Sequence, residues 1–156
     1  MLLLMAMKLV IAAFPEGATV PAIHTCEGAD LSPAIEWTGA PEGAKSFALI
    51  VDDPDAPGGV WNHWLLFNIP AGVHAIAQGY KPGKLGESGS NDFGKTGYNG
   101  PCPPRGGGVH RYYFKVFALD VAKLDLKEGA SRAQLERSMH GHVVGQAEYV
   151  GRFGRK

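Results

Sequence analysis

An anion-binding pocket could be built around four side chains of this 156-residue chain, namely Asp53, His63, His110 and Tyr112. Imidazole N–H and phenol O–H groups donate hydrogen bonds, which an oxyanion such as phosphate accepts. Taken singly, each residue has a simpler explanation. An Asp before Pro commonly caps a turn, and a histidine in an apolar strand commonly belongs to the core. The prediction of a binding pocket therefore depends on whether the four side chains converge.

Two of the four follow or interrupt strongly apolar segments. Residues Ser46–Asp52 and Trp61–Ile69 are near-continuous apolar runs, typical of strands buried on both faces, and a Pro- and Gly-rich turn joins them. Because side chains alternate along a strand, Asp53 should extend an apolar face of the first strand. By the same alternation, His63 should share its face with Leu65.

The other two open a third predicted strand, which covers residues 110–120. His110 and Tyr112 are two residues apart, so they should lie side by side on one face. They follow a glycine-rich segment of residues 79–109, and a long irregular segment in a compact domain is usually functional unless it is disordered. Backbone N–H groups of its last part could add to an anion-binding concavity. The segment lacks the phosphate-loop pattern of nucleotide-binding proteins, so its glycines alone are weak support.

The rest of the chain favours a mainly β class, an antiparallel β-sandwich with one or two short helices. The 22 glycines and 11 prolines separate short apolar runs, and no alternation of strands and helices is visible. A capping box at Ser131 and Gln134 predicts a short helix that Gly141 ends. The further predicted strands cover residues 8–14, 35–38 and 142–153.

Composition excludes several partner classes. Fifteen basic residues balance fifteen acidic ones, so no overall field attracts nucleic acid. The apolar N-terminus lacks a basic leading segment, Lys8 interrupts it, and it is too short to span a bilayer. We therefore expect an N-terminal extension of residues 1–6, a single domain over residues 7–156, no membrane span and a cytoplasmic location.

The two cysteines give a weaker indication. Cys26 and Cys102 are far apart and have no zinc-type spacing, so neither a structural metal nor a cofactor is expected. The sequence leaves a disulfide open. For a cytoplasmic protein, two reduced buried thiols are the favoured interpretation.

Four short motifs together resemble the phosphatidylethanolamine-binding protein family, in its bacterial and archaeal Raf kinase inhibitor-like branch. They are D-P-D-A-P from position 53, W-x-H-W from 61, G-P-x-P-P from 100 and H-R-Y from 110. The resemblance covers nearly the whole chain and implies antiparallel sheets with a small anion pocket at one end. In it, Asp53 would orient or charge a histidine. Carried over by motif, the ligand-binding residues would be Asp53, Asp55, Trp61, His63, Gly100, Pro101, His110 and Tyr112.

The resemblance implies a binding protein without catalytic residues, whose ligand is phosphate, a carboxylate or a phospholipid headgroup. Two alternatives stay open at this point. One is an inhibitor of a protein kinase or serine protease that acts through surface loops. The other is a hydrolase, since two histidines and a carboxylate could bind a metal or act as acid and base. The family also suggests a homodimer. The segment Arg105–Val109 is longer than in bacterial members, which predicts a looser pocket rim.

Overall fold

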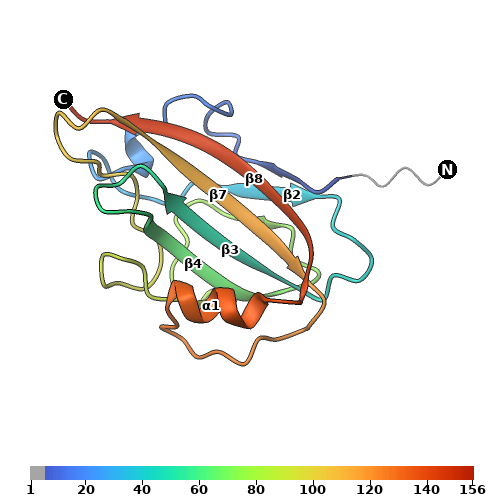
Figure 1. The fold of residues 1–156 in the computed structure, drawn as a ribbon. Helices are drawn as coiled ribbons and strands as arrows, with labels where there is room; N and C mark the ends of the chain where they lie inside the picture. The colour runs from blue at the N-terminus through green and yellow to red at the C-terminus, as the bar shows by residue number, and fades with distance from the viewer. Residues whose placement is uncertain (1–5) are drawn as a thin grey trace.

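Two antiparallel β-sheets form the framework of the computed structural model, which describes residues 6–156. The smaller sheet has the order β1-β2-β5, with β1 (Lys8–Val10), β2 (Ile35–Thr38) and β5 (Ala75–Ile76). The larger sheet has the order β6-β4-β3-β7-β8, with β6 (Glu87–Ser88), β4 (Trp61–Pro70), β3 (Ser46–Asp53), β7 (Val109–Leu119) and β8 (Val143–Gly154). Figure 1 shows the four long strands side by side, with β3 between β4 and β7. The mainly β, antiparallel prediction is confirmed.

The larger sheet is buried on both faces along β3, which explains its unbroken apolar sequence. On the inner face, Phe47 and Leu49 pack with Trp37 of the smaller sheet in one core cluster. On the outer face, Ala48 and Ile50 pack in a second cluster, which includes residues of helix α1 (Arg132–Met139). Alternation along β3 therefore assigns odd-numbered residues to the space between the sheets and even-numbered ones to the helix side.

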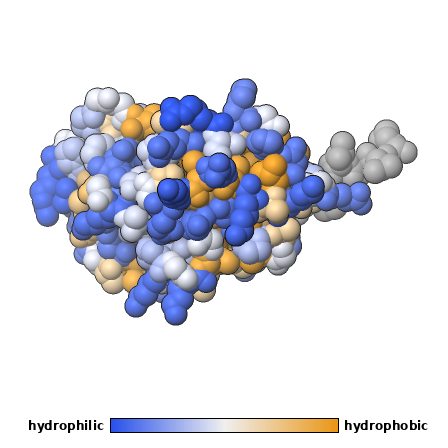
Figure 2. All heavy atoms as spheres, turned by 90° about the horizontal axis from the view of Figure 1, so that it is seen from below, coloured by the Kyte–Doolittle hydropathy of each residue, from blue (hydrophilic) through white to orange (hydrophobic). Residues whose placement is uncertain are grey.

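Helix α1 covers the outer face at the β4 side of the sheet (Figure 1). The predicted capping box is present: the Ser131 hydroxyl accepts from Gln134 N, and the Gln134 side chain accepts from Ser131 N. Leu135 and Met139 are the buried residues of the helix and join the outer cluster. Figure 2 views the molecule from below Figure 1, where hydrophilic residues dominate and apolar side chains show between them in small groups.

Several predicted boundaries hold, and three elements differ. The strands at 35–38, 46–53, 61–70, 109–119 and 143–154 match the predictions to within a residue. The first strand ends at Val10 instead of Phe14, because its partner β2 is only four residues long. Ile11 and Phe14 are nonetheless buried in the inner core. The short strands β5 and β6 were not predicted, since two residues carry no periodicity. The predicted extension of residues 1–6 lies outside the described residues except for Ala6.

Cys26 and Cys102 form a disulfide, so the prediction of two reduced thiols is wrong. The bridge ties the segment of the 3-10 helix η1 (Ala22–His24) to the proline-rich loop before β7. Hydrogen bonds join the same two segments, from Cys26 N to Pro101 O and from the Tyr98 hydroxyl to His24 O. Sequence alone could not show this meeting, because the cysteines are 76 positions apart. Within residues 6–156, no helix is long and apolar enough to cross a bilayer.

Candidate functional site

A pocket of about 300 Å³ lies where β3 ends and β4 and β7 begin. Because β3 pairs antiparallel with both β4 and β7, the end of β3 and the beginnings of β4 and β7 lie at the same end of the larger sheet. Five of the eight residues predicted from the sequence line the pocket. They are Asp53, Trp61, His63, His110 and Tyr112.

A buried pair of His110 and Asp53 forms one wall. The Nδ1 atom of His110 lies 2.7 Å from Asp53 Oδ2, and both side chains are almost fully buried. A carboxylate accepts hydrogen bonds, so Nδ1 carries the proton and donates it. The other carboxylate oxygen accepts from Asp55 N at 2.8 Å. Asp53 therefore fixes the ring of His110 and leaves its Nε2 atom for another partner.

His63 is anchored in the same manner to a different acceptor. Its Nδ1 atom donates to the backbone oxygen of Asn99 at 2.7 Å, which fixes the ring against the loop. Burial lowers the pKa of His63, so the neutral ring is favoured at pH 7. The ring also contacts Phe93 and Tyr112 edge to face, with centroids 5.2 and 5.3 Å apart. Neither histidine uses Nε2 in any hydrogen bond among residues 6–156.

Tyr112 brings a buried hydroxyl that no partner satisfies within residues 6–156. Its side chain is 1% exposed and lines the pocket. Burial, together with the charge and the nearby oxygens of Asp53, raises the pKa of Tyr112 far above its ordinary value, although the geometry of the hydroxyl and the carboxylate makes no hydrogen bond. The hydroxyl is therefore a permanent hydrogen-bond donor. A buried donor without an acceptor is costly, which points to a ligand that accepts from it.

A β-bulge turns His63 toward the pocket. Val51 pairs with Trp64 and Asp52 pairs with Asn62, so His63 has no partner on β3. In the bulge, His63 lies on the inner side, as does Trp64, and Asn62 lies on the side of Asp52. Bulges commonly redirect a side chain next to a functional site.

The bulge also makes one face prediction wrong. Leu65 packs in the outer cluster beneath α1, whereas His63 lies on the inner side of the sheet. Strict alternation had placed the two side chains on the same face. The extra residue in β4 breaks this alternation between them.

Three of the predicted residues lie outside the pocket lining. Asp55 accepts from Arg111 Nη2 at 2.8 Å and from Nε at 2.9 Å, and this contact lowers its pKa to about 2. Gly100 N donates to Asp30 Oδ1, and a side chain at Gly100 would meet the backbone of η1. Pro101 O accepts from the segment after η1. These residues belong to the turn and the wall behind the pocket.

Sequence reasoning missed most of the pocket's apolar lining. The additional residues are Ala56, Pro57, Phe93, Cys102, Pro103 and Pro104. Phe93 is the one phenylalanine of the glycine-rich segment 79–109, and this was the available signal for it. Its ring contacts both Trp61 and His63 edge to face, with centroids 5.6 and 5.2 Å apart, so Phe93 joins these two pocket residues. Within residues 6–156, no group of three His, Cys, Asp or Glu side chains is arranged to hold a metal ion.

Comparison with known proteins gives a consistent match over this whole arrangement. The profile of a family described as phosphatidylethanolamine-binding protein matches residues 10–154. An Aquifex aeolicus protein named UPF0098 is 48% identical over 146 residues, 92% of this chain and 85% of that protein. The crystal structure of E. coli YbcL, described as a new member of the mammalian PEBP family, gives a TM-score of 0.90. It is 35% identical and covers 97% of this chain and 100% of YbcL.

A mycobacterial relative bears on location. The Mycobacterium tuberculosis protein LppC, which is named as a candidate lipoprotein, is 42% identical over 140 residues. The match covers 90% of this chain and 68% of that protein.

Proposed function

The chain belongs to the phosphatidylethanolamine-binding protein family, and from this premise we propose that its pocket binds the phosphate or carboxylate group of a small molecule. The lining supports a ligand with an anionic end and an apolar remainder. Hydrogen-bonding side chains lie on the strand ends, while Trp61, Phe93 and the prolines contribute apolar surface. A free phosphate, a carboxylate and a phospholipid headgroup share this anionic chemistry.

The observation that carries the proposal is the unpartnered hydroxyl of Tyr112. It is buried at the pocket wall and donates to no atom of residues 6–156. An oxyanion would accept from it and remove the cost of an unsatisfied donor.

The two histidines support the same ligand in complementary ways. With Nδ1 held by Asp53, a protonated His110 would donate from Nε2, and its charge would balance the buried carboxylate. His63 is favoured in the neutral form, so its Nε2 would accept. A protonated oxyanion such as hydrogen phosphate offers both an accepting oxygen and a donating hydroxyl. Among these ligands, hydrogen phosphate can use both histidines, whereas a carboxylate or a phosphodiester would use the donors of His110 and Tyr112 alone.

Isothermal titration calorimetry with inorganic phosphate tests this proposal. Binding should weaken at least tenfold in His110→Ala, since a charge-assisted hydrogen bond contributes about 1.5–3 kcal/mol. A matched control is His142→Ala. His142 forms a similar pair with Asp120 at 2.8 Å outside the pocket, so its loss should leave the affinity unchanged. Equal affinity in the wild type and His110→Ala would contradict the proposal.

The same variant separates the alternative functions. Inhibition of a kinase or a serine protease through surface loops should survive His110→Ala, whereas an effect of the pocket should not. Turnover of p-nitrophenyl phosphate or p-nitrophenyl acetate that depends on His110 would instead favour a hydrolase.

Inhibition and a homodimer stay predictions, as does the cytoplasmic location. Against that location, disulfides are typical of oxidising compartments, and one relative is named as a candidate lipoprotein. Intracellular proteins of hyperthermophiles are the exception, since they also contain disulfides.

A further inference from the structure

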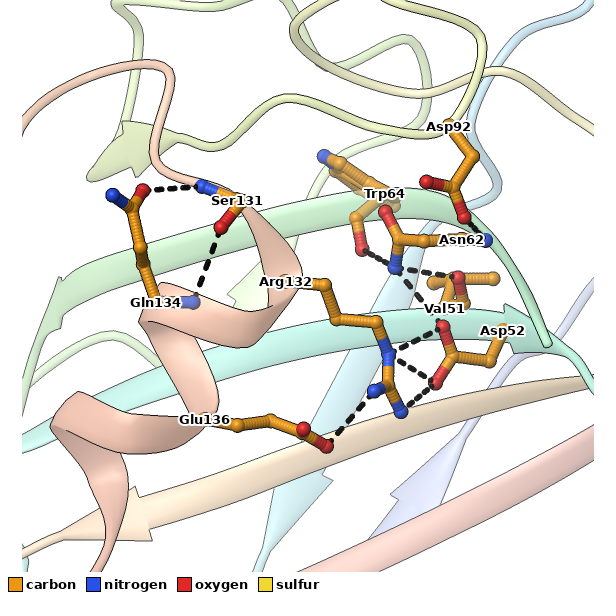
Figure 3. Close-up of polar contacts among 9 residues, drawn as sticks. All are labelled: Val51, Asp52, Asn62, Trp64, Asp92, Ser131, Arg132, Gln134 and Glu136. Atoms are coloured by element: carbon orange, nitrogen blue, oxygen red, sulfur yellow. Dashed lines mark hydrogen bonds and ion pairs between the residues drawn. The ribbon is translucent and has the colours of Figure 1, made fainter.

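The bulge that presents His63 needs hydrogen bonds of its own, and Asn62 supplies them. A bulge interrupts the ladder and leaves backbone groups that the neighbouring strand no longer satisfies. The Asn62 Nδ2 atom lies 3.2 Å from Val51 O and 3.4 Å from Trp64 O, the carbonyls on either side of the bulge. Figure 3 shows the amide nitrogen between these two oxygens. The Asn62 side chain is fully buried.

The orientation of this amide is fixed from the helix side of the sheet. Asn62 Nδ2 also donates to Asp52 Oδ1 at 3.0 Å. Asp52 in turn is held by Arg132 of α1, with Nη2 at 2.7 Å and Nε at 3.1 Å from its oxygens. Figure 3 shows the guanidinium between the first turn of α1 and the carboxylate. The capping box starts the helix one residue before Arg132 and so fixes where this cation lies.

The backbone of Asn62 is held by the loop that borders the pocket. Asn62 N donates to Asp92 Oδ2 at 2.6 Å, and Asp92 N donates to Asn62 O. The next residue, His63, is bonded to Asn99 twice, since Asn99 N donates to His63 O and the ring donates to Asn99 O. The position of the imidazole therefore depends on bonds from both sides of the sheet.

We infer that Asn62 is a positioning residue, which holds the bulge that presents His63 to the pocket and is itself oriented by the Asp52–Arg132 pair. This inference rests on the proposed function of that pocket. It assigns a role in the binding site to Asn62, Asp52 and Arg132, three residues that do not line the pocket and whose side chains meet on the helix side of the sheet. Arg132 acts through Asp52, and Asp52 acts through Asn62.

The test compares variants that break this chain of contacts with one that spares it. Asn62→Leu removes the amide at similar volume, and Arg132→Gln removes the cation that orients Asp52. Arg132→Lys restores the charge. The matched control is Glu136→Gln, because Glu136 pairs with Arg132 at 2.9 Å on the exposed side of the same helix without contacting Asp52.

Two readouts are measured at a temperature where each variant is fully folded. The first is the dissociation constant for inorganic phosphate. It should rise about tenfold in Asn62→Leu, which is the lower end of the loss seen when a residue that orients a metal ligand is replaced. It should rise severalfold in Arg132→Gln. The second is the tautomer and titration of His63, followed by nitrogen-detected NMR of the ring. Charged and titratable groups that act on this ring are Asp30, Asp52, Asp53, His110 and Tyr112.

The expected result is a single Nδ1–H tautomer of His63 in the wild type and Glu136→Gln, and a tautomer mixture with an altered titration midpoint in the disrupting variants. Arg132→Lys should recover the wild-type spectrum in part. A variant that unfolds more easily yet keeps the wild-type His63 spectrum and phosphate affinity would overturn the inference. If Asn62→Leu does not fold, the three helix variants decide the question. If the wild type binds no phosphate, the proposed function fails, while the His63 spectra still test the positioning.

Discussion

Asp52 and Asp53 are consecutive in β3, yet their carboxylates serve opposite faces of the sheet. Asp53 lies 2.7 Å from the imidazole of His110 in the pocket. Asp52 lies 2.7 Å from the guanidinium of Arg132, which belongs to α1. Both carboxylates are at least 95% buried. The main partner of Asp53 is an imidazole ring, and the main partner of Asp52 is a guanidinium group. The strand thus connects the candidate pocket directly to the contact that holds the helix.

Tyr112→Phe should have opposite effects on stability and on binding. The variant removes a buried hydroxyl without a partner, so the ligand-free protein should be about 1 kcal/mol more stable. Phosphate binding should weaken about fivefold, because a net hydrogen bond contributes about 1 kcal/mol. Urea unfolding without ligand and calorimetry with phosphate measure the two effects. Loss of stability in the variant would mean that the hydroxyl already has an acceptor in the free protein.

His63 should make the folded state sensitive to mild acid. Burial lowers its pKa in the folded protein, whereas the unfolded chain has the ordinary value of about 6.5. Below that pH the unfolded state binds more protons, so stability falls as the pH falls, by at most about 1.4 kcal/mol per pH unit. His63→Gln should flatten this slope between pH 7 and 5 in urea unfolding. A slope identical to that of the wild type would show that another group causes the dependence.

Asp55→Asn should leave phosphate binding within twofold of the wild type. Asp55 belongs to the D-P-D-A-P motif, but its side chain pairs with Arg111 outside the pocket. Its pKa is lowered to about 2 by Arg111. The stabilisation by this ion pair is therefore fully present above the ordinary pKa of an Asp carboxyl, and it is lost only as the pH falls through about 2. The pair is exposed, and its effect on stability at pH 7 should be small. A large loss of affinity, measured by calorimetry, would place Asp55 in the site after all.

Reduction of the disulfide should destabilise the protein and loosen the pocket. The bridge closes a loop between residues 76 positions apart and so lowers the conformational entropy of the unfolded chain. This stabilises the folded state by about 4 kcal/mol. Cys102 lines the pocket, so phosphate affinity should also fall severalfold. Urea unfolding and calorimetry, each with and without dithiothreitol, measure these effects. The double variant Cys26→Ser/Cys102→Ser is the control and should not respond to the reductant.

Much of this fold could be predicted because its central strands have a simple periodicity. The predicted strands at 46–52 and 110–120 identified the paired strands β3 and β7, and alternation placed His110 beside Tyr112. The capping box identified the start of α1. These features depend on neighbouring residues alone, so the sequence contains them in full.

The remaining features depend on pairing between distant segments. The bulge exists only in the register of β4 against β3, and so the face of Leu65 was predicted wrongly. The motifs predicted Asp55 and Gly100 as ligand-binding residues. They could not show that Asp55 binds Arg111 instead, or that Gly100 N donates to Asp30. The disulfide likewise required two loops to meet in space.

The bulge in β4 has a consequence for insertions and deletions in this strand. On either side of His63, pairing with β3 runs in a regular antiparallel register, with Val51 opposite Trp64 and Asp52 opposite Asn62. A chain that lacked His63 would therefore keep the neighbouring residues of both strands on their present faces, and the ladder would run regularly as far as the second register shift, between Phe47 and Leu49. In the register of β4 against β3, His63 is a one-residue insertion. A deletion at this position is the change that would remove the imidazole from the pocket while restoring regular pairing at the end of β4 next to it.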